Sequence, residues 1–351
     1  MEPLGVYVHV PFCARRCDYC AFATWTDRDH LIDEYLDALA LDIERGVAAG
    51  LAPISTVFVG GGAPTRVPPA GLVRALAPLP LVDGAEVTVE CNPDDVTVEL
   101  LRTFRGGGVT RISLGVQSMV DRVLIALGRS HDRANVERAV AAARDVGLDV
   151  NLDLIYGGAG ETLDDWRASL DAVLALAPDH VSAYALTVEP GTPLAADPAR
   201  HPDDDDQADK YLLADELLTT AGYRNYEISN WARPGRECRH NLLYWRQGDY
   251  LGFGAAAHSH RSGRRWWNLR TPERYIAAVQ AGSSTEAAAE ELDDEGRRVE
   301  GLQLRIRTSD GVPAGVVPAD VAHLTEVGAD GRARLNRQGR LLANEVAVRL
   351  R

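Results

Sequence analysis

Three cysteines lie close together near the start of the chain, at Cys13, Cys17 and Cys20. Thiolates at this Cys-x3-Cys-x2-Cys spacing bind soft metals and iron–sulfur clusters well. A structural zinc site needs four closed ligands, and here a histidine such as His9 or His30 would have to complete it. Three thiolates on a four-iron cluster would instead leave one iron free to bind an exogenous ligand. The spacing therefore favours a cluster over zinc.

The residues around the cysteines indicate which kind of metal site the three thiolates form. An apolar strand at residues 6–10 leads directly into the cysteine loop, and Tyr19 precedes the last cysteine. In both respects the segment resembles the radical S-adenosylmethionine (SAM) superfamily. The resemblance implies a [4Fe–4S] cluster bound by the three cysteines, with SAM chelated to the free iron. It also implies that one electron from the cluster cleaves SAM to give a 5′-deoxyadenosyl radical.

Two kinds of element alternate along the first two thirds of the chain. Short apolar runs predict β-strands at residues 6–10, 56–60, 86–90, 111–115, 148–155 and 180–187. Amphipathic stretches predict helices at residues 31–49, 96–104, 133–146, 163–176 and 207–221. Buried strands separated by helices are typical of parallel sheets built from βαβ units. We therefore predict an α/β fold with a partial (β/α)6 TIM-like barrel, whose site lies at the carboxyl ends of the strands. A doubly wound sheet is the alternative.

Glycines and carboxylates lie at or near the ends of several predicted strands. Gly61 and Gly62 follow the second strand, where the absence of a Cβ lets the backbone approach a ligand closely. Glu90 ends the third strand. Asp153 lies in the apolar fifth strand, where an isolated carboxylate is costly unless it is paired or functional. Asp153 is thus either a ligand-binding residue or the partner of an arginine such as Arg129.

The family resemblance extends to positions throughout the predicted barrel. It implies no catalytic side chain, and it leaves Cys91 as a small buried thiol outside the cluster. The positions that it assigns to SAM binding are Tyr7, Tyr19, Gly61, Gly62, Thr65, Glu90, Gln117, Arg129 and Asp153.

Within the superfamily, the chain resembles the branch of oxygen-independent coproporphyrinogen III oxidases and their haem-chaperone relatives. The oxidases have a further cysteine where this chain has Phe22, and a long N-terminal extension where six residues precede Tyr7. Residues 240–245 show the His-Asn-x-x-Tyr-Trp pattern of the chaperones. The resemblance implies a protein that binds haem as cargo and delivers it to an acceptor haemoprotein, without oxidising coproporphyrinogen. The alternative is an oxidative decarboxylase of porphyrinogen propionates.

His240 begins that pattern and is a candidate haem contact. A neutral imidazole is a good ligand for haem iron, and four of the six tryptophans lie between residues 231 and 267. Their flat apolar surfaces suit a porphyrin. The alternative is a tryptophan-rich core in which His240 and His258 are hydrogen-bonded.

The chain is predicted to have three parts. Residues 1–230 form the barrel, residues 231–285 carry the His-Asn-x-x-Tyr-Trp segment, and residues 286–351 form a small, mainly helical C-terminal domain. Two short strands around a Gln338-Gly339 turn predict a winged-helix-like shape for this domain. The acidic runs at residues 203–206 and 290–295 are predicted to be helix starts or linkers.

Composition limits the partners. The formal net charge of -14 argues against nucleic acid or an anionic membrane surface as the main partner. The chain shows no signal segment and no apolar run of ~18 residues, and its cysteines form no disulfide pattern, so we expect a cytoplasmic protein. The resemblance implies an electron donor such as a flavodoxin or ferredoxin. It is compatible with a membrane-associated acceptor and with a homodimer.

Overall fold

Six parallel strands form the centre of the computed structural model, which describes residues 4–351. They are β1 (Leu4–Val10), β2 (Ile54–Gly61), β3 (Leu81–Cys91), β4 (Arg111–Gln117), β5 (Asp149–Tyr156) and β6 (His180–Ala185). Each strand pairs with the next one along the chain. A doubly wound sheet would reverse its strand order midway, so the consecutive order confirms the predicted partial barrel and excludes that alternative.

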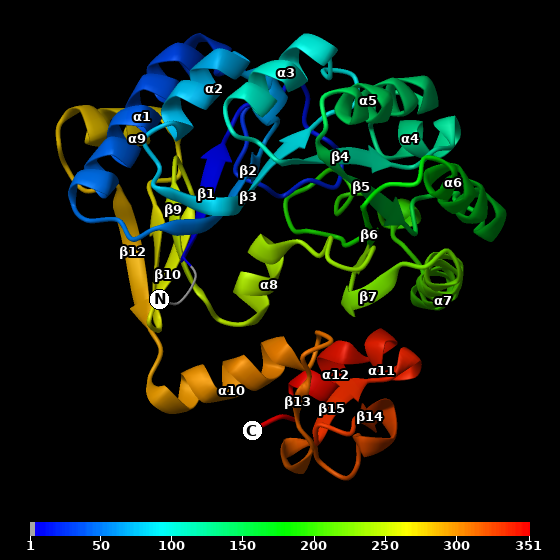
Figure 1. Cartoon of the computed structure of the whole chain (residues 1–351). Coiled ribbons are helices and arrows are strands. Elements are labelled where there is room, and N and C mark those ends of the chain that lie inside the picture. The colour runs from blue at the N-terminus through cyan, green and yellow to red at the C-terminus, as the bar shows by residue number, and fades with distance from the viewer. Residues whose placement is uncertain (1–3) are drawn as a thin grey trace.

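Helices follow the strands and cover the outer face of the sheet (Figure 1). They are α1 (Ile32–Ala48), α2 (Pro69–Leu76), α3 (Val98–Gly106), α4 (Asp121–Ala126), α5 (Arg133–Asp145), α6 (Leu163–Ala175) and α7 (Asp204–Thr220). Their apolar sides face the strands; on α1, Leu36, Leu39 and Ile43 are completely buried in the main core. Strand side chains alternate between this covered face and the barrel interior.

A layer of polar side chains crosses the barrel interior. The strand register aligns Glu90 on β3 with Ser113 on β4, Asn151 on β5 and His180 on β6. The Asn151 amide donates to the Ser113 hydroxyl at 2.6 Å, and its oxygen lies 2.6 Å from Nδ1 of His180. These contacts place the polar groups in one layer, which lies near the end of β3 but near the starts of β4, β5 and β6.

Further strands extend the sheet on both sides. Beyond β6 lie β8 (Asn230–Ala232) and β7 (Arg224–Glu227); beyond β1 lie β9 (Asp249–Phe253), β10 (His258–Arg261), β11 (Arg264–Asn268) and β12 (Glu286–Glu291). Only β9 among these runs parallel to its neighbour in the barrel. Within residues 4–351, the end strands β12 and β7 do not pair, so the barrel stays open. Two helices accompany these strands, α8 (Arg239–Trp245), which contacts β2, and α9 (Pro272–Gln280), which packs on α1.

The chain ends in a small unit beneath the barrel in Figure 1. It contains α10 (Asp294–Arg305), α11 (Arg337–Leu341) and α12 (Ala343–Ala347) around the strands β13 (Val312–Pro313), β14 (Thr325–Val327) and β15 (Arg332–Leu335). The unit has a hydrophobic core of its own. Although residues 286–351 were expected to form this unit, β12 at 286–291 lies in the large sheet.

The predicted Gln338-Gly339 strand turn is wrong. The hairpin of β14 and β15 closes at residues 328–331, where the sequence Ala329-Asp330-Gly331 also predicts a turn. The side chain of Asn336 accepts a hydrogen bond from the Gly339 backbone N–H at 2.8 Å. This N-cap makes the Gln-Gly pair the start of α11.

The acidic runs both contain a helix N-cap. Asp203 accepts from the backbone N–H of Asp206 at the start of α7, which confirms the first run as a helix start. Asp293 caps α10 in the same way, whereas Glu290 and Glu291 belong to β12. No helix within residues 4–351 combines the length and the apolar character that crossing a membrane requires.

Candidate functional site

The cysteine loop leaves the carboxyl end of β1 and closes on itself. The backbones of Phe12 and Trp25 form an isolated β-bridge, and the Cys13 N–H donates to the Trp25 carbonyl at 3.0 Å. This closed base fixes both ends of the loop at the barrel edge. Cys13, Cys17 and Cys20 all remain half-buried, as unbonded thiols.

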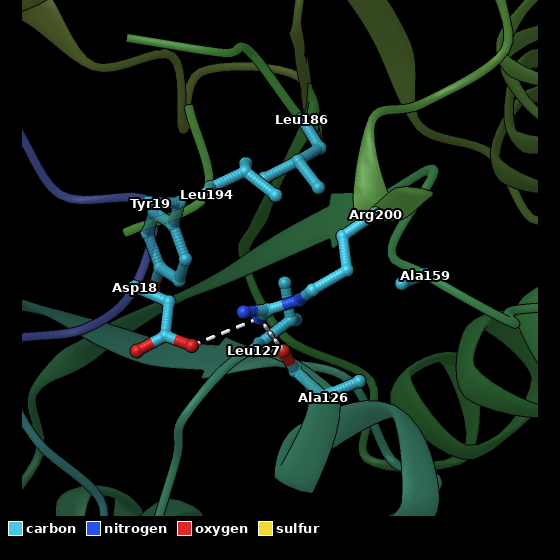
Figure 2. A pocket seen from close by; sticks show the side chains of 8 residues that line it. All are labelled: Asp18, Tyr19, Ala126, Leu127, Ala159, Leu186, Leu194 and Arg200. Atoms are coloured by element: carbon cyan, nitrogen blue, oxygen red, sulfur yellow. Dashed lines mark hydrogen bonds and ion pairs between the residues drawn. The ribbon is translucent and has the colours of Figure 1, made fainter. Parts of the chain in front are cut away.

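The tip of the loop is anchored to the chain that follows β6. Figure 2 shows Arg200 between two partners: it donates to the Asp18 carboxylate at 2.9 Å and to the Ala126 carbonyl at 2.7 Å. Tyr19 packs on a small apolar cluster that includes Leu194. The structure therefore places Tyr19 as a packing residue that holds the loop.

The cysteines sit in an environment that disfavours free thiolates. Burial raises the pKa of the Cys13 thiol to about 11, and the charge of Cys20 adds to this effect. Burial also raises the pKa of Cys20. Arg129 offers a balancing charge, because its guanidinium donates to Sγ of Cys17 at 3.4 Å. Metal binding would therefore release protons from this loop, since the thiolate is the ligand form.

The two histidines that could complete a zinc site lie in different settings. Within residues 4–351, no three His, Cys, Asp or Glu side chains form a preformed metal-ligand group. Both nitrogens of His9 are engaged, Nδ1 with the Tyr7 hydroxyl at 3.0 Å and Nε2 with the Ala23 carbonyl at 2.9 Å. His30 is exposed in a 3-10 turn.

Gly61 and Gly62 pass directly over the start of the cysteine loop. A Cβ at Gly61 would lie 2.5 Å from Nδ1 of His9, and one at Gly62 would lie 2.6 Å from the Phe12 carbonyl oxygen. Gly61 also has φ +108°, a conformation that favours glycine. The glycines are thus needed for packing against β1, in addition to any role at a ligand.

Glu90 lies beside these glycines. Its carboxylate accepts from the Gly61 N–H at 3.2 Å. Burial raises the pKa of Glu90 to about 8, helped by the negative charge of Asp153 and opposed by the Gly61 hydrogen bond. Two facing carboxylates in a partly buried site are stabilised by a ligand that brings positive charge or hydroxyl donors.

Arg129 and Gln117 meet at the end of β4. Arg129 donates to Oδ1 of Asn92 at 3.0 Å and to the Gly115 carbonyl at 3.2 Å. Gln117 has φ +63°, which is uncommon for a residue with a side chain and is typical of functional sites. A Cβ at Gly115 would lie 3.1 Å from the Gln117 amide, and the Arg129 guanidinium is also close to it. The side chains of Gln117 and Arg129 therefore share the small space beside Gly115.

The alternative interpretation of Asp153, an ion pair with Arg129, is wrong. Its carboxylate instead accepts from the Ser113 hydroxyl and from the Asn151 amide, both at 2.7 Å. Asn151 lies two residues before Asp153 on the same face of β5 and pairs with Ser113 on β4, whereas Arg129 is committed to Cys17 and Asn92.

Two of the expected residues have local structural partners. The Thr65 hydroxyl donates to the Asp95 carboxylate at 2.8 Å, which ties the turn after β2 to the turn after β3. Cys91 is buried, as expected, with its thiol 3.6 Å from the Val89 carbonyl.

His240 lies away from the cysteine loop, inside the fold. Its Nδ1 is 2.9 Å from the Thr56 hydroxyl, its Nε2 is 2.7 Å from the Tyr244 hydroxyl, and its ring stacks on Phe58. Burial lowers the pKa of His240 to about 3. The structure thus supports the alternative interpretation for His240, a buried hydrogen-bonded histidine. His258 is exposed on β10 and stacks on Trp267.

A large cleft separates the barrel from the C-terminal unit. Its volume is about 910 Å³, and it is lined by the ends of β5 and β6, by α7 and α8, and by residues of α10 to α12. Aromatic side chains form part of its wall: Tyr156, Tyr184, Tyr211, Tyr244 and Trp245. No local sequence signal marks this cleft, because its two sides come from distant parts of the chain.

The structure brings most of the predicted residues to one edge of the barrel. Tyr7, Gly61, Gly62, Glu90, Gln117, Arg129, Asp153 and the cysteine loop gather at the carboxyl ends of β1 to β5, while His240 does not. Sequence reasoning did not predict the supporting roles of His9, Asn92 and Ser113, which hold Tyr7, Arg129 and Asp153. The alternation of inward-facing positions was the signal that could have found His9 and Ser113.

The comparisons with known proteins agree with this site. The family model of the Radical SAM superfamily matches residues 7–173. Together with the barrel and the cysteine loop, this match defines a radical SAM protein, a class that uses a [4Fe–4S] cluster and SAM.

Two curated relatives make the assignment more specific. "Heme chaperone HemW" of Mycobacterium tuberculosis is 41% identical to this chain, covering 98% of it and 94% of the relative. "Heme chaperone HemW" of Bacillus subtilis is 33% identical, covering 97% of each. The chain therefore belongs to the HemW family.

A solved structure shares the fold along nearly the whole chain. Coproporphyrinogen III oxidase (HemN) from Escherichia coli superposes with a TM-score of 0.85 at 23% identity, covering 99% of this chain and 90% of that one. At this identity the likeness shows the fold alone.

Proposed function

We propose that the protein is a haem chaperone, which binds haem and delivers it to an acceptor haemoprotein. The observation that carries the proposal is the cleft of about 910 Å³ beside the strand ends, in a chain whose full-length relatives are named heme chaperones. Its size lies within the range of cofactor-binding pockets, and its aromatic wall suits a flat macrocycle.

The cysteine loop fits a cluster ligand set. Cys13, Cys17 and Cys20 would hold the [4Fe–4S] cluster, with Arg129 near Cys17 to offset negative charge. When bound, the cluster supplies an electron for the reductive cleavage of SAM. The residues around it keep the loop in place through the Phe12–Trp25 bridge.

The polar edge of the barrel fits SAM. Burial, helped by the negative charge of Asp153, raises the pKa of Glu90, and an ammonium or hydroxyl group near the Glu90 carboxylate would stabilise its ionised form. Arg129 has a thiol and neutral groups as its hydrogen-bond partners and would suit a carboxylate. In this proposal these side chains bind and orient SAM, with Tyr7 and Gln117 beside them.

Phe22 supports a chaperone over an oxidase. Its side chain is 64% exposed on the cysteine loop, at the position where the oxidases that the chain resembles carry a cysteine. A phenyl group there cannot act as a metal ligand or thiol donor.

The test is anaerobic and compares two substrates. The reconstituted protein receives SAM and reductant with either coproporphyrinogen III or haem plus an apo-haemoprotein. We expect haem transfer and no CO2. Release of CO2 in step with 5′-deoxyadenosine would identify an oxidase instead, and a Cys13→Ser variant serves as the control that cannot load the cluster normally.

A further inference from the structure

One guanidinium in the cleft lacks a counter-ion. Arg307 follows α10 and lines the cleft. Its hydrogen bonds go to neutral oxygens, the Gln303 carbonyl and the Asn344 side chain, the latter at 2.8 Å. Among residues 4–351, no carboxylate lies within 4 Å of it. Burial lowers the pKa of Arg307, as expected for a charge that loses water without gaining an anion.

The other arginine of the cleft is already neutralised. Arg340 donates two hydrogen bonds to the Asp215 carboxylate, both at 2.8 Å. This bidentate pair leaves Arg340 little capacity for a further anion. Arg307 is therefore the cation available to a ligand.

The position of Arg307 is fixed by the barrel. The next residue, Thr308, forms a bridge with Glu227 at the end of β7, and the Ser309 N–H donates to the Tyr226 carbonyl at 2.8 Å. The side chain thus comes from the C-terminal unit but is held at the mouth of the barrel.

The floor of the same cleft contains two unpartnered polar atoms. The Tyr211 hydroxyl and Oδ1 of Asn230 are buried and have no hydrogen-bond partner within residues 4–351. Their residues are 4% and 2% exposed. Buried polar atoms of this kind are uncommon in native proteins. They leave unsatisfied hydrogen-bonding capacity directly beneath the cleft surface.

We propose that Arg307 binds a propionate carboxylate of the tetrapyrrole cargo, with the macrocycle lying along the aromatic wall of the cleft. The inference rests on the proposed function and specifies how the cargo is recognised. A carboxylate is favoured over a polyphosphate, because Asp204, Asp205 and Glu227 also line the cleft and would repel a highly charged anion.

This arrangement makes the cargo bridge the two units. Trp245 lies on α8 of the barrel side, whereas Arg307 belongs to the C-terminal side. Removing the carboxylate from the ligand should therefore weaken binding as much as removing the guanidinium, since both changes delete the same contact.

The experiment measures affinity by Soret titration with two probes, haemin and haemin dimethyl ester. We expect Arg307→Gln to weaken haemin binding about 10- to 100-fold, the size of one charged hydrogen-bonded contact, while ester binding changes by less than about twofold. Arg307→Lys should fall between wild type and Arg307→Gln, because it keeps the charge and loses the planar fork. Arg305→Gln is the matched control, an exposed neighbour that is not part of the cleft lining.

The outcomes separate the two proposals. Equal haemin binding by wild type and Arg307→Gln, or equal binding of haemin and its ester by wild type, overturns the role of Arg307 and leaves the chaperone proposal standing. Absence of haemin binding by the wild-type protein overturns both. Ester binding by Arg307→Gln shows that the variant is folded.

Discussion

Gly61→Ala is the substitution whose cost follows most directly from the geometry. Gly61 has φ +108°, and its new Cβ would lie 2.5 Å from Nδ1 of His9. His9 cannot move freely, because its ring bonds to the Tyr7 hydroxyl and to the Ala23 carbonyl. Displacing the ring therefore disturbs both the position of Tyr7 and the return of the cysteine loop at Ala23.

The expected loss of unfolding free energy in Gly61→Ala has two parts. A left-handed conformation costs an L-residue about 1–2 kcal/mol. Loss of the two hydrogen bonds of His9 adds about 1–3 kcal/mol. We expect the free energy of unfolding of the apo protein to fall by about 2–5 kcal/mol in total.

Gly50→Ala isolates the first part. Gly50 has φ +91° and nothing within 4 Å of its would-be Cβ, so only the backbone term applies. We would measure urea unfolding of both variants and of His9→Ala with and without Gly61→Ala. The Gly61 variant should lose about 1–3 kcal/mol more than the Gly50 variant, and this excess should vanish when His9 is absent. Equal losses for the two glycine variants would refute the reasoning.

Three further predictions concern the site. Cys17→Ser should at least halve the iron bound after anaerobic reconstitution, measured by iron and sulfide analysis, whereas Cys91→Ser should not. In the wild type, the raised pKa of about 8 makes folded Glu90 hold a proton between pH 4.5 and pH 8, so its contribution to stability falls as the pH rises through this window. Glu90→Gln should abolish this fall. The difference between the urea unfolding midpoints of variant and wild type should therefore grow from pH 4.5 to pH 8, and a constant difference would contradict the prediction. His240→Leu should lower the free energy of unfolding by about 2–4 kcal/mol, since two buried hydroxyls lose their partner, and leave the Soret wavelength unchanged; a shifted Soret band would restore His240 as a haem ligand.

The sequence predicted the parallel strands well, because each is a short apolar run. The predicted strand at 111–115 is β4 (Arg111–Gln117), and the predicted helix at 163–176 is α6 (Leu163–Ala175). Thr162, an N-cap type of residue, marks the start of that helix and does accept from the N–H of Asp165. Local signals suffice where burial and capping act within one element.

The antiparallel edge was missed for a physical reason. β11 (Arg264–Asn268) is rich in arginine and tryptophan, and β12 (Glu286–Glu291) is an exposed run of alanine and glutamate that has little strand propensity. Their pairing joins Trp266 to Ala289 across a helix and its connections. Tertiary contact, which no local pattern reveals, creates these strands.

Strand geometry explains why the Arg129 alternative for Asp153 is wrong. Charge alone suggests Arg129, but Asn151 lies two residues away on the same face of β5 and pairs with Ser113 on β4, so these two side chains are nearer. The haem role of His240, which is inferred from its chemistry and from the His-Asn-x-x-Tyr-Trp pattern, stays a prediction; in this structure Thr56 and Tyr244 take both of its nitrogens. Residue type predicts what a side chain can bind, and the fold determines which partner reaches it first.

Tyr244 connects the buried His240 to the wall of the cleft. Tyr244 lines the cleft and bonds to His240. Burial raises its pKa, and negative charge on Tyr250, Tyr7 and Glu90 adds to the effect. The Tyr244 hydroxyl is thus a direct contact between the cleft wall and His240. Removing the His240 imidazole would leave this hydroxyl without its partner, so a change at His240 should be felt at the cleft wall through Tyr244.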